Sequence, residues 1–132
     1  MIKFSELNIG NIVVAEFEGI KMEGEITDLN HDEKQVEVTT KIQALWYELE
    51  HLYPIPLSDE ILLQFNFTKH ENEDGSIKYM KDAFRLVTPS KNNFSEIEMW
   101  YREDRRHHPD VHYLHQLQNH FVSMTKVHLT TE

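Results

Sequence analysis

The 132-residue sequence contains no cysteine, only four glycines and four prolines, and no apolar run near the roughly 20 residues that span a membrane. The missing thiols exclude a disulfide framework, a thiolate metal site and a cysteine nucleophile. Neither a Gly-rich phosphate loop nor a Gly-x-Ser-x-Gly elbow is present, and no signal peptide is visible. The sequence therefore predicts a soluble, cytoplasmic, non-enzymatic protein without a cofactor or a membrane segment.

Basic residues are also scarce, because 13 Lys and Arg stand against 23 Asp and Glu, a formal net charge of −10. Eight acids and two lysines fall within residues 16–37, and the acids are Glu16, Glu18, Glu23, Glu25, Asp28, Asp32, Glu33 and Glu37. Such a field repels nucleic-acid phosphates and attracts basic partners. Glutamates on exposed strands also keep proteins soluble. Two interpretations stay open: a solubilising surface, or a surface that occupies a basic groove of another protein.

The clearest periodic pattern lies near the C-terminus. Its apolar residues are spaced 3, 3, 4 and 3 apart: Val111, Leu114, Leu117, Phe121 and Met124. This spacing puts one apolar stripe on a helix. Asp110 is the predicted N-cap, because its carboxylate can accept from the first-turn amides. We therefore predict a packing helix over residues 110–125.

Residues 2–40 predict β-structure. Residues 12–17 are rich in β-branched side chains, residues 20–27 and 36–39 alternate, and turn residues separate the three segments. Short strands with tight turns indicate a bent sheet of the SH3-like barrel type, with carboxylates on its solvated side, Glu16 and Glu18 sharing one face. Residues 41–53 fit a helix or a closing strand, and the strand is preferred because Pro54 and Pro56 impose extended structure.

The second half predicts mixed structure. A helix starts at the N-cap Ser58, Asp74 and Gly75 mark a hairpin, strands cover residues 83–87 and 94–101, and residues 126–130 form a short edge strand. A charged linker is predicted over residues 102–108. The fold class is therefore α+β, with an SH3-like β subdomain over residues 1–56 and an α+β subdomain over residues 57–132. The two could also form one integrated domain.

The concentrated basic patch follows two aromatic residues and comprises Trp100, Arg102, Arg105 and Arg106, with His107 and His108 after them. Arginine beside aromatic rings suits contact with protein or nucleic acid. Glu103 and Asp104 interrupt the patch, however, and pairing with the arginines would leave an ordinary solvated loop.

Six of the nine histidines lie between His107 and His128. His112 and His115 are three residues apart, so on a helix they could meet one ion, with Glu103 or Asp104 as a further ligand. No His-Glu-x-x-His pattern accompanies them, and solvated or helix-packing histidines are the preferred interpretation. No metal site is predicted.

Three short motifs occur in order along the chain: Ile9-Gly10-Asn11, then Pro54-Ile55-Pro56-Leu57 with Glu60-Ile61-Leu62, and finally Tyr113-Leu114-His115-Gln116-Leu117-Gln118-Asn119. Together they resemble a family of small bacterial proteins encoded in prophages and other mobile elements. The resemblance brings no catalytic residues. It implies a mobile-element protein, and small acidic proteins of this kind are often inhibitors of host defence.

The leading functional prediction is a non-catalytic protein that binds a host protein with a basic surface, such as an anti-CRISPR-type inhibitor of a nucleic-acid-guided nuclease. The eight acids of residues 16–37 would make the main contact, and Trp100, Arg102, Arg105 and Arg106 a second one. The alternative is a structural or regulatory module of the mobile element that contacts nucleic acid through Arg102–His108.

Overall fold

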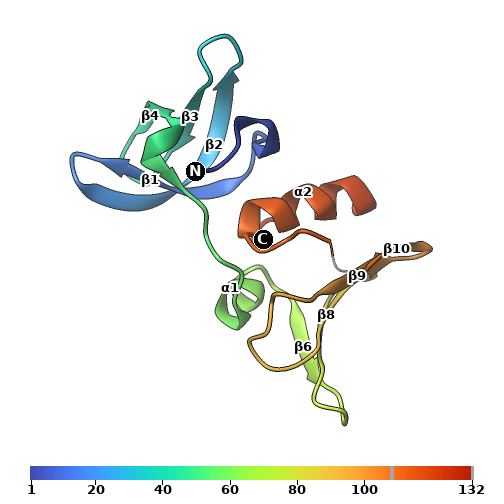
Figure 1. Cartoon of the computed structure of the whole chain (residues 1–132). Coiled ribbons are helices and arrows are strands. Elements are labelled where there is room, and N and C mark those ends of the chain that lie inside the picture. The colour runs from blue at the N-terminus through green and yellow to red at the C-terminus, as the bar shows by residue number, and fades with distance from the viewer. Residues whose placement is uncertain (108, 132) are drawn as a thin grey trace. The chain divides into compact units, whose positions relative to one another are not determined.

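The computed structural model describes residues 1–107 and 109–131, and the chain divides into two compact units (Figure 1). Unit 1 comprises Met1–Ile55 and Tyr113–Asn119, and unit 2 comprises Pro56–His112 and His120–Glu132. Each unit is built on a five-stranded sheet whose strands pair in antiparallel fashion. The predicted α+β class is therefore confirmed. The division into subdomains of residues 1–56 and 57–132, or their integration into one domain, stays a prediction.

Unit 1 contains five strands and two 3₁₀ helices before the final helix: η1 (Phe4–Glu6), β1 (Ile12–Phe17), β2 (Ile20–Asn30), β3 (Gln35–Thr39), β4 (Ala44–Glu48), η2 (Leu49–His51) and β5 (Leu52–Tyr53). The strand order is β4-β3-β2-β1-β5, so the last strand returns to pair with the first. Within residues 1–107 and 109–131 no closed barrel is formed.

The long strand β2 is irregular where it crosses from β1 to β3. Its register with β3 shifts between Ile26 and Asp28, as at a β-bulge. Gly24 lies just before this point, and a Cβ there would stand 2.5 Å from Val38 Cγ1 and 2.8 Å from the carbonyl oxygen of Thr39. Only glycine leaves room for this close approach of β3 to β2.

The core of unit 1 follows from strand alternation. Every second residue of β1 and β3 is buried, at Val13, Ala15, Val36 and Val38. Tyr47 of β4 and Leu52 of β5 complete the same core. The intervening side chains point to the other face of the sheet, which carries the charged residues.

Unit 2 contains one short helix, five strands and the second half of the long helix: α1 (Asp59–Gln64), β6 (Thr68–Glu71), β7 (Ile77–Lys81), β8 (Phe84–Thr88), β9 (Glu98–Tyr101), β10 (Asp104–His107) and α2 (Leu114–Thr125). The strand order is β10-β9-β8-β7-β6, a simple meander. Phe121 of α2 packs on the sheet, with its ring centroid 4.8 Å from that of Phe84 and 6.5 Å from that of Phe67.

Two local predictions for unit 2 are confirmed. The Ser58 hydroxyl oxygen accepts a hydrogen bond from the backbone N–H of Ile61 at 3.2 Å, as an N-cap should. Asp74 and Gly75 lie in the turn between the paired strands β6 and β7. Both features depend on residues close in sequence, which explains why the sequence reveals them.

Three other predictions are wrong. The charged segment after Trp100 is a hairpin rather than a linker, because Arg102 adopts a left-handed turn and β10 pairs with β9. Helix α2 begins at Leu114, so Asp110 lies too far before it to be its N-cap. The Asp110 carboxylate lies 3.0 Å from His112 Nε2 instead. Residues 126–130 are not a strand. In the part of the chain that the structure describes, no helix is long and apolar enough to cross a membrane.

Candidate functional site

The apolar side of the β1–β2 hairpin continues beyond the core of unit 1. Phe17 and Ile20 lie on the same face as the buried residues Val13, Ala15 and Ile26, because side chains alternate along each strand. At the hairpin end, however, Phe17 is 44% exposed and Ile20 is 62% exposed. The face that elsewhere forms the core is therefore open to solvent at this end.

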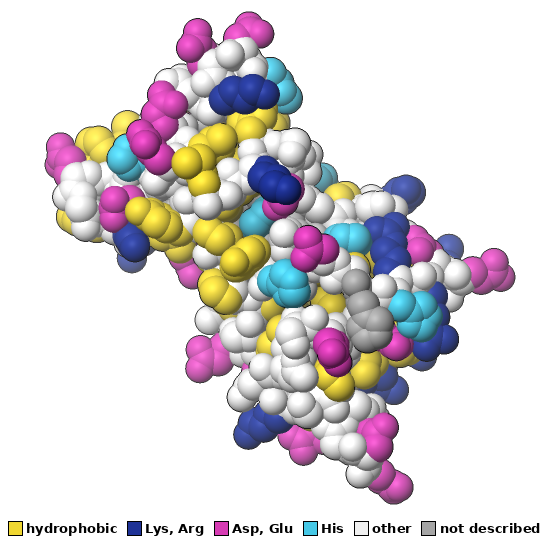
Figure 2. All heavy atoms as spheres, viewed as in Figure 1, with side chains coloured by type: hydrophobic (Ala, Val, Ile, Leu, Met, Phe, Trp, Pro, Cys, Tyr) yellow, Lys and Arg dark blue, Asp and Glu magenta, His cyan; other side chains and the backbone are white. Residues whose placement is uncertain are grey.

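Two adjoining hollows mark this end of unit 1, and we call them together the groove. One, of about 210 Å³, lies between the hairpin and the β3–β4 turn, where Ile42 is 66% exposed. The other, of about 330 Å³, lies between the hairpin tip and β4, where Trp46 is 45% exposed. Both are lined by Phe17, Glu18 and Tyr47. Figure 2 shows hydrophobic side chains at the surface of this unit beside acidic ones.

Carboxylates rim the apolar groove. Glu16 and Glu48 line the larger hollow, and Glu18 lines both. Among the described residues none of these three carboxylates forms an ion pair. Unit 1 as a whole holds eleven acidic residues and four lysines, a net charge of −7. Apolar surface with uncompensated negative charge around it is suited to a partner that is both apolar and basic.

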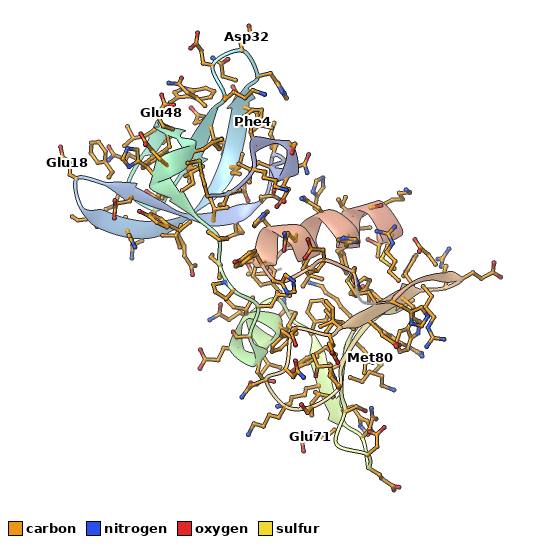
Figure 3. All side chains as sticks on the ribbon, in the orientation of Figure 1. Phe4, Glu18, Asp32, Glu48, Glu71 and Met80 are labelled. Atoms are coloured by element: carbon orange, nitrogen blue, oxygen red, sulfur yellow. The ribbon has the colours of Figure 1, made fainter. Side chains whose placement is uncertain are left out.

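The eight predicted acids do not form one face. Glu16, Glu23 and Glu25 lie on the outer face of the β1–β2 pair, and Asp28 stands opposite Glu37 between β2 and β3. Glu18 sits in a tight turn with φ of 52° and not on the strand, so strand alternation does not relate it to Glu16, although both line the larger hollow. Asp32 and Glu33 belong to the β2–β3 turn. Figure 3 shows Glu18 and Asp32 at the tips of different hairpins.

Although they are dispersed, these carboxylates have few partners. Glu37 accepts a hydrogen bond from the Thr27 hydroxyl at 2.8 Å, and Asp28 accepts one from the backbone N–H of Leu29 at 2.8 Å. Within residues 1–107 and 109–131, none of these eight carboxylates forms an ion pair with a lysine, arginine or histidine. The nearest lysine in the β1–β2 pair, Lys21, lies over the Tyr53 ring at 4.1 Å.

The basic patch of unit 2 is largely paired internally. Arg105 binds Glu98 at 3.2 Å and Arg106 binds Asp104 at 3.1 Å. The hydrogen bond from Arg105 is the main reason why the pKa of Glu98 is lowered. The Arg102 guanidinium lies 5.0 Å from the Tyr101 ring centre. Trp100 lies between two arginines, and His108 is outside the described residues.

The clustered histidines do not assemble a metal site in the residues that can be placed, since no three His, Asp or Glu side chains there could hold one ion. His112 is exposed and pairs with Asp110, whereas His115 is buried and its Nε2 lies 3.1 Å from Glu6 Oε2. The Nδ1 atom of His115 is buried without a hydrogen-bond partner among the described atoms. His115 is therefore a helix-packing histidine.

Burial also predicts a pH dependence. The pKa of His115 is lowered mainly by desolvation, which the Glu6 carboxylate partly opposes, and the pKa of His120 is lowered by burial and by Arg106. The folded state therefore favours the neutral rings, whose unfolded pKa is about 6.5. The stabilisation that the two neutral rings provide is therefore fully present above that pH, and it is lost as the pH drops through the folded pKa values.

We expect urea midpoints to fall between about pH 7 and 5, with a shallower fall in His115→Gln. The control His70→Gln, an exposed histidine, should keep the wild-type slope.

The motif residues at the two ends of unit 1 meet in a hydrogen-bonded cluster. Gln118 Oε1 accepts from the backbone N–H of Ile12 at 2.8 Å, and its Nε2 donates to the Gly10 carbonyl at 3.1 Å. Asn119 Oδ1 accepts from the side-chain amide of Asn11 at 3.0 Å. The Leu114 backbone N–H donates to the Ile55 carbonyl at 2.8 Å. These motif residues thus have a structural role.

Sequence reasoning missed the groove. Its apolar members Phe17, Ile20, Ile42 and Trp46 carry no motif, and the available signal was a pair of apolar residues flanking the tight Glu18–Gly19 turn. The acids Glu16 and Glu18 were predicted, but Glu48 was not.

Comparison with known protein families, curated proteins and solved structures finds no match to this chain. The function must therefore be inferred from its own residues.

Proposed function

We propose that this chain is a non-catalytic binding protein whose unit 1 engages a basic surface of another protein. The observation that carries the proposal is the groove, in which exposed Phe17, Ile42 and Trp46 lie beside carboxylates that form no ion pair with any described residue, those of Glu16, Glu18 and Glu48. Aromatic and aliphatic side chains supply the affinity of protein interfaces, while surrounding charge steers the encounter and selects the partner.

The class of partner follows from charge and from the resemblance to mobile-element proteins. A net charge of −7 on unit 1 repels nucleic acid and favours proteins with basic surfaces, of which nucleic-acid channels are the most basic. We therefore propose an inhibitor that acts in the cytoplasm on a host protein, with a nucleic-acid-guided nuclease as the first target to test. In this proposal the carboxylates take positions that phosphates would otherwise occupy.

We further propose that unit 1 has the topology of an SH3-like small barrel that, in the described residues, is open between β4 and β5. Three features support this assignment: the strand order β4-β3-β2-β1-β5, the 3₁₀ helix η2 directly before β5, and the long, bulged β2. In such a fold, one strand bends to serve both halves of the sheet. The hairpin end and β4 then lie beside each other, which is where the groove is found.

Charge reversal tests the proposed function. The variant with Lys at Glu16, Glu18, Glu23 and Glu25 is expected to lose binding to the captured host protein about 100-fold, because each exposed charge contributes a fraction of a kcal/mol and reversal doubles the effect. The affinity should be measured by biolayer interferometry at two salt concentrations, against a partner captured from nuclease-treated host lysate.

A matched control reverses four exposed acids of unit 2, Glu60, Glu73, Glu96 and Glu103, which changes the net charge equally. Retention of binding by this control, with loss in the unit 1 variant, would support the proposal. An equal loss of affinity in both variants would show that only the net charge of the chain matters. No loss of affinity in either variant would remove the acidic residues from the mechanism.

A second candidate function has one observation in its favour. On the outer face of the unit 2 sheet, Trp100 is paired across the strands with Arg85 and Arg105, whose guanidinium carbons lie 6.0 and 5.5 Å from its ring centre. A tryptophan between arginines is suited to stacking on a nucleic-acid base. A gel-shift with short RNA and DNA at low and moderate salt tests it. Binding that disappears in Arg85→Gln with Arg105→Gln would favour this nucleic-acid-contacting module over the inhibitor.

A further inference from the structure

We propose that the groove takes an extended segment of the partner, with alternating basic and apolar side chains, which adds to the sheet of unit 1 along the free edge of β4. This inference rests on the proposed function, because it names the part of a basic partner that unit 1 would recognise. It depends on three features of unit 1: an unpaired strand edge, a hollow beside that edge, and the charge around it.

The edge of β4 that faces away from β3 has no strand beside it in the described chain. The Thr40 backbone N–H donates to the Gln43 carbonyl at 2.9 Å, which sets the alternation of the β3–β4 ladder. Leu45 and Tyr47 then bond to β3, while the N–H and C=O groups of Ala44 and Trp46 and the N–H group of Glu48 point outward. The Glu48 carbonyl belongs to η2, because Glu48 is the N-cap of that helix. Such a row of backbone groups is a template for another strand.

A hollow of about 330 Å³ lies along this edge. It is lined on one side by β4 residues and on the other by Glu16 to Gly19 at the end of β1. Strand β5 pairs with β1 at Val14 and Ala15 only, so the end of β1 is also unpaired on that side. The hollow is therefore a strip between two free strand edges.

The side chains around the strip define the chemistry of the occupant. Phe17 and Tyr47 offer an apolar surface, and Glu16, Glu18 and Glu48 offer negative charge. An extended segment directs successive side chains to opposite faces, so one set can contact the rings and the other set the carboxylates. Alternating aliphatic and Arg or Lys residues satisfy both. A second copy of this chain is disfavoured, because two units of net charge −7 would have to meet.

The test uses two fluorescein-labelled ten-residue peptides of identical composition, with fluorescence anisotropy on the full chain as the readout. In one peptide arginine and valine alternate, and in the other five arginines precede five valines. We expect the alternating peptide to bind at least about tenfold more tightly, because both peptides have the backbone groups to pair with β4 but only the alternating one directs all valines to one face and all arginines to the other. Phe17→Ser should remove this preference, while Leu63→Ser, a residue of unit 2 that is 45% exposed, should keep it.

Backbone pairing is isolated by comparing Trp46→Pro with Trp46→Ala. Both remove the indole, but only proline removes the outward N–H, and proline is tolerated on an edge strand at such a position. We expect Trp46→Pro to bind the alternating peptide about tenfold more weakly than Trp46→Ala. Two N-methylated alternating peptides, one methylated on its valines and one on its arginines, give the same information on the unmodified protein. The backbone N–H groups that pair with β4 belong to every second residue of the peptide, so methylation removes them from one of the two peptides and not from the other.

The outcomes separate this inference from the proposed function. Equal binding of both peptides, lost on reversal of Glu16 and Glu18, would overturn strand addition and leave the acidic interface intact. No binding of either peptide would overturn the inference, and the charge-reversal experiment on the captured partner would still decide the proposed function. A concentration-dependent dimer that Trp46→Pro abolishes would assign the edge to a second copy and would also overturn it.

Discussion

Replacing Asn119 with aspartate is expected to lower the free energy of unfolding by about 2–4 kcal/mol. Asn119 is held in unit 1 by three hydrogen bonds: its Oδ1 accepts from the side-chain amides of Asn8 and Asn11, each at 3.0 Å, and its Nδ2 donates to the Glu6 carbonyl at 2.6 Å. Aspartate has the same shape, but it places an oxygen against the Glu6 carbonyl. A donor is thus replaced by a repelling acceptor.

The measurement is urea denaturation at pH 7, with Asn93→Asp as the matched control. The Asn93 side-chain oxygen accepts from the Ser95 backbone N–H and hydroxyl, and aspartate keeps both bonds. The control should therefore change stability by less than about 0.5 kcal/mol. An equally small change in Asn119→Asp would contradict the idea that this amide fastens the first residues of the chain to α2.

Helix α2 also illustrates what a sequence can and cannot reveal. Its apolar stripe is a local pattern of period 3.6, so Leu114, Leu117, Phe121 and Met124 could be predicted as buried. Gln118 and Asn119 look like ordinary surface residues of that helix, because their partners lie more than 100 residues away. Hydrogen bonds at that separation leave no periodic trace.

Strand β10 was missed for a related reason. Asp104 to His107 contains no apolar residue, and its pairing with β9 depends on the Arg102 turn and on ion pairs such as Arg105–Glu98. A charged strand of this kind lacks the alternation by which strands are recognised. The groove could not be predicted from local sequence either, because only the fold of the whole sheet brings Ile42 and Trp46 close to the β1–β2 hairpin.

The positions of the candidate binding residues could also be predicted only where they depend on local sequence. The sequence places Glu23 and Glu25 on one face of their strand, because alternation along a strand is local. Turn residues also place Glu18 and Asp32 in two different turns. The sequence cannot show that Arg105 and Arg106 are already paired, which leaves the acidic groove as the stronger candidate for an interface.

Replacing Phe121 with alanine is expected to lower the free energy of unfolding by about 3–5 kcal/mol, because it removes a buried ring and leaves a cavity. Phe121 is 4% exposed and contacts the rings of Phe84 and Phe67. Phe121→Leu, which keeps most of the volume, should cost about 1–1.5 kcal/mol. Val122→Ala, at the next and half-buried position, is the control and should cost less than about 1 kcal/mol.

Hydrogen exchange on the Phe121 and Asn119 variants tests the two-subdomain prediction. Phe121 belongs to unit 2 and Asn119 to unit 1, although both lie on α2. If the units unfold separately, Phe121→Ala will accelerate exchange in β7 to β9 and leave β1 to β3 unchanged, while Asn119→Asp will do the opposite. If either variant instead accelerates hydrogen exchange equally in both sheets, the chain unfolds as one cooperative domain, because loss of the shared helix α2 would then destabilise both units at once.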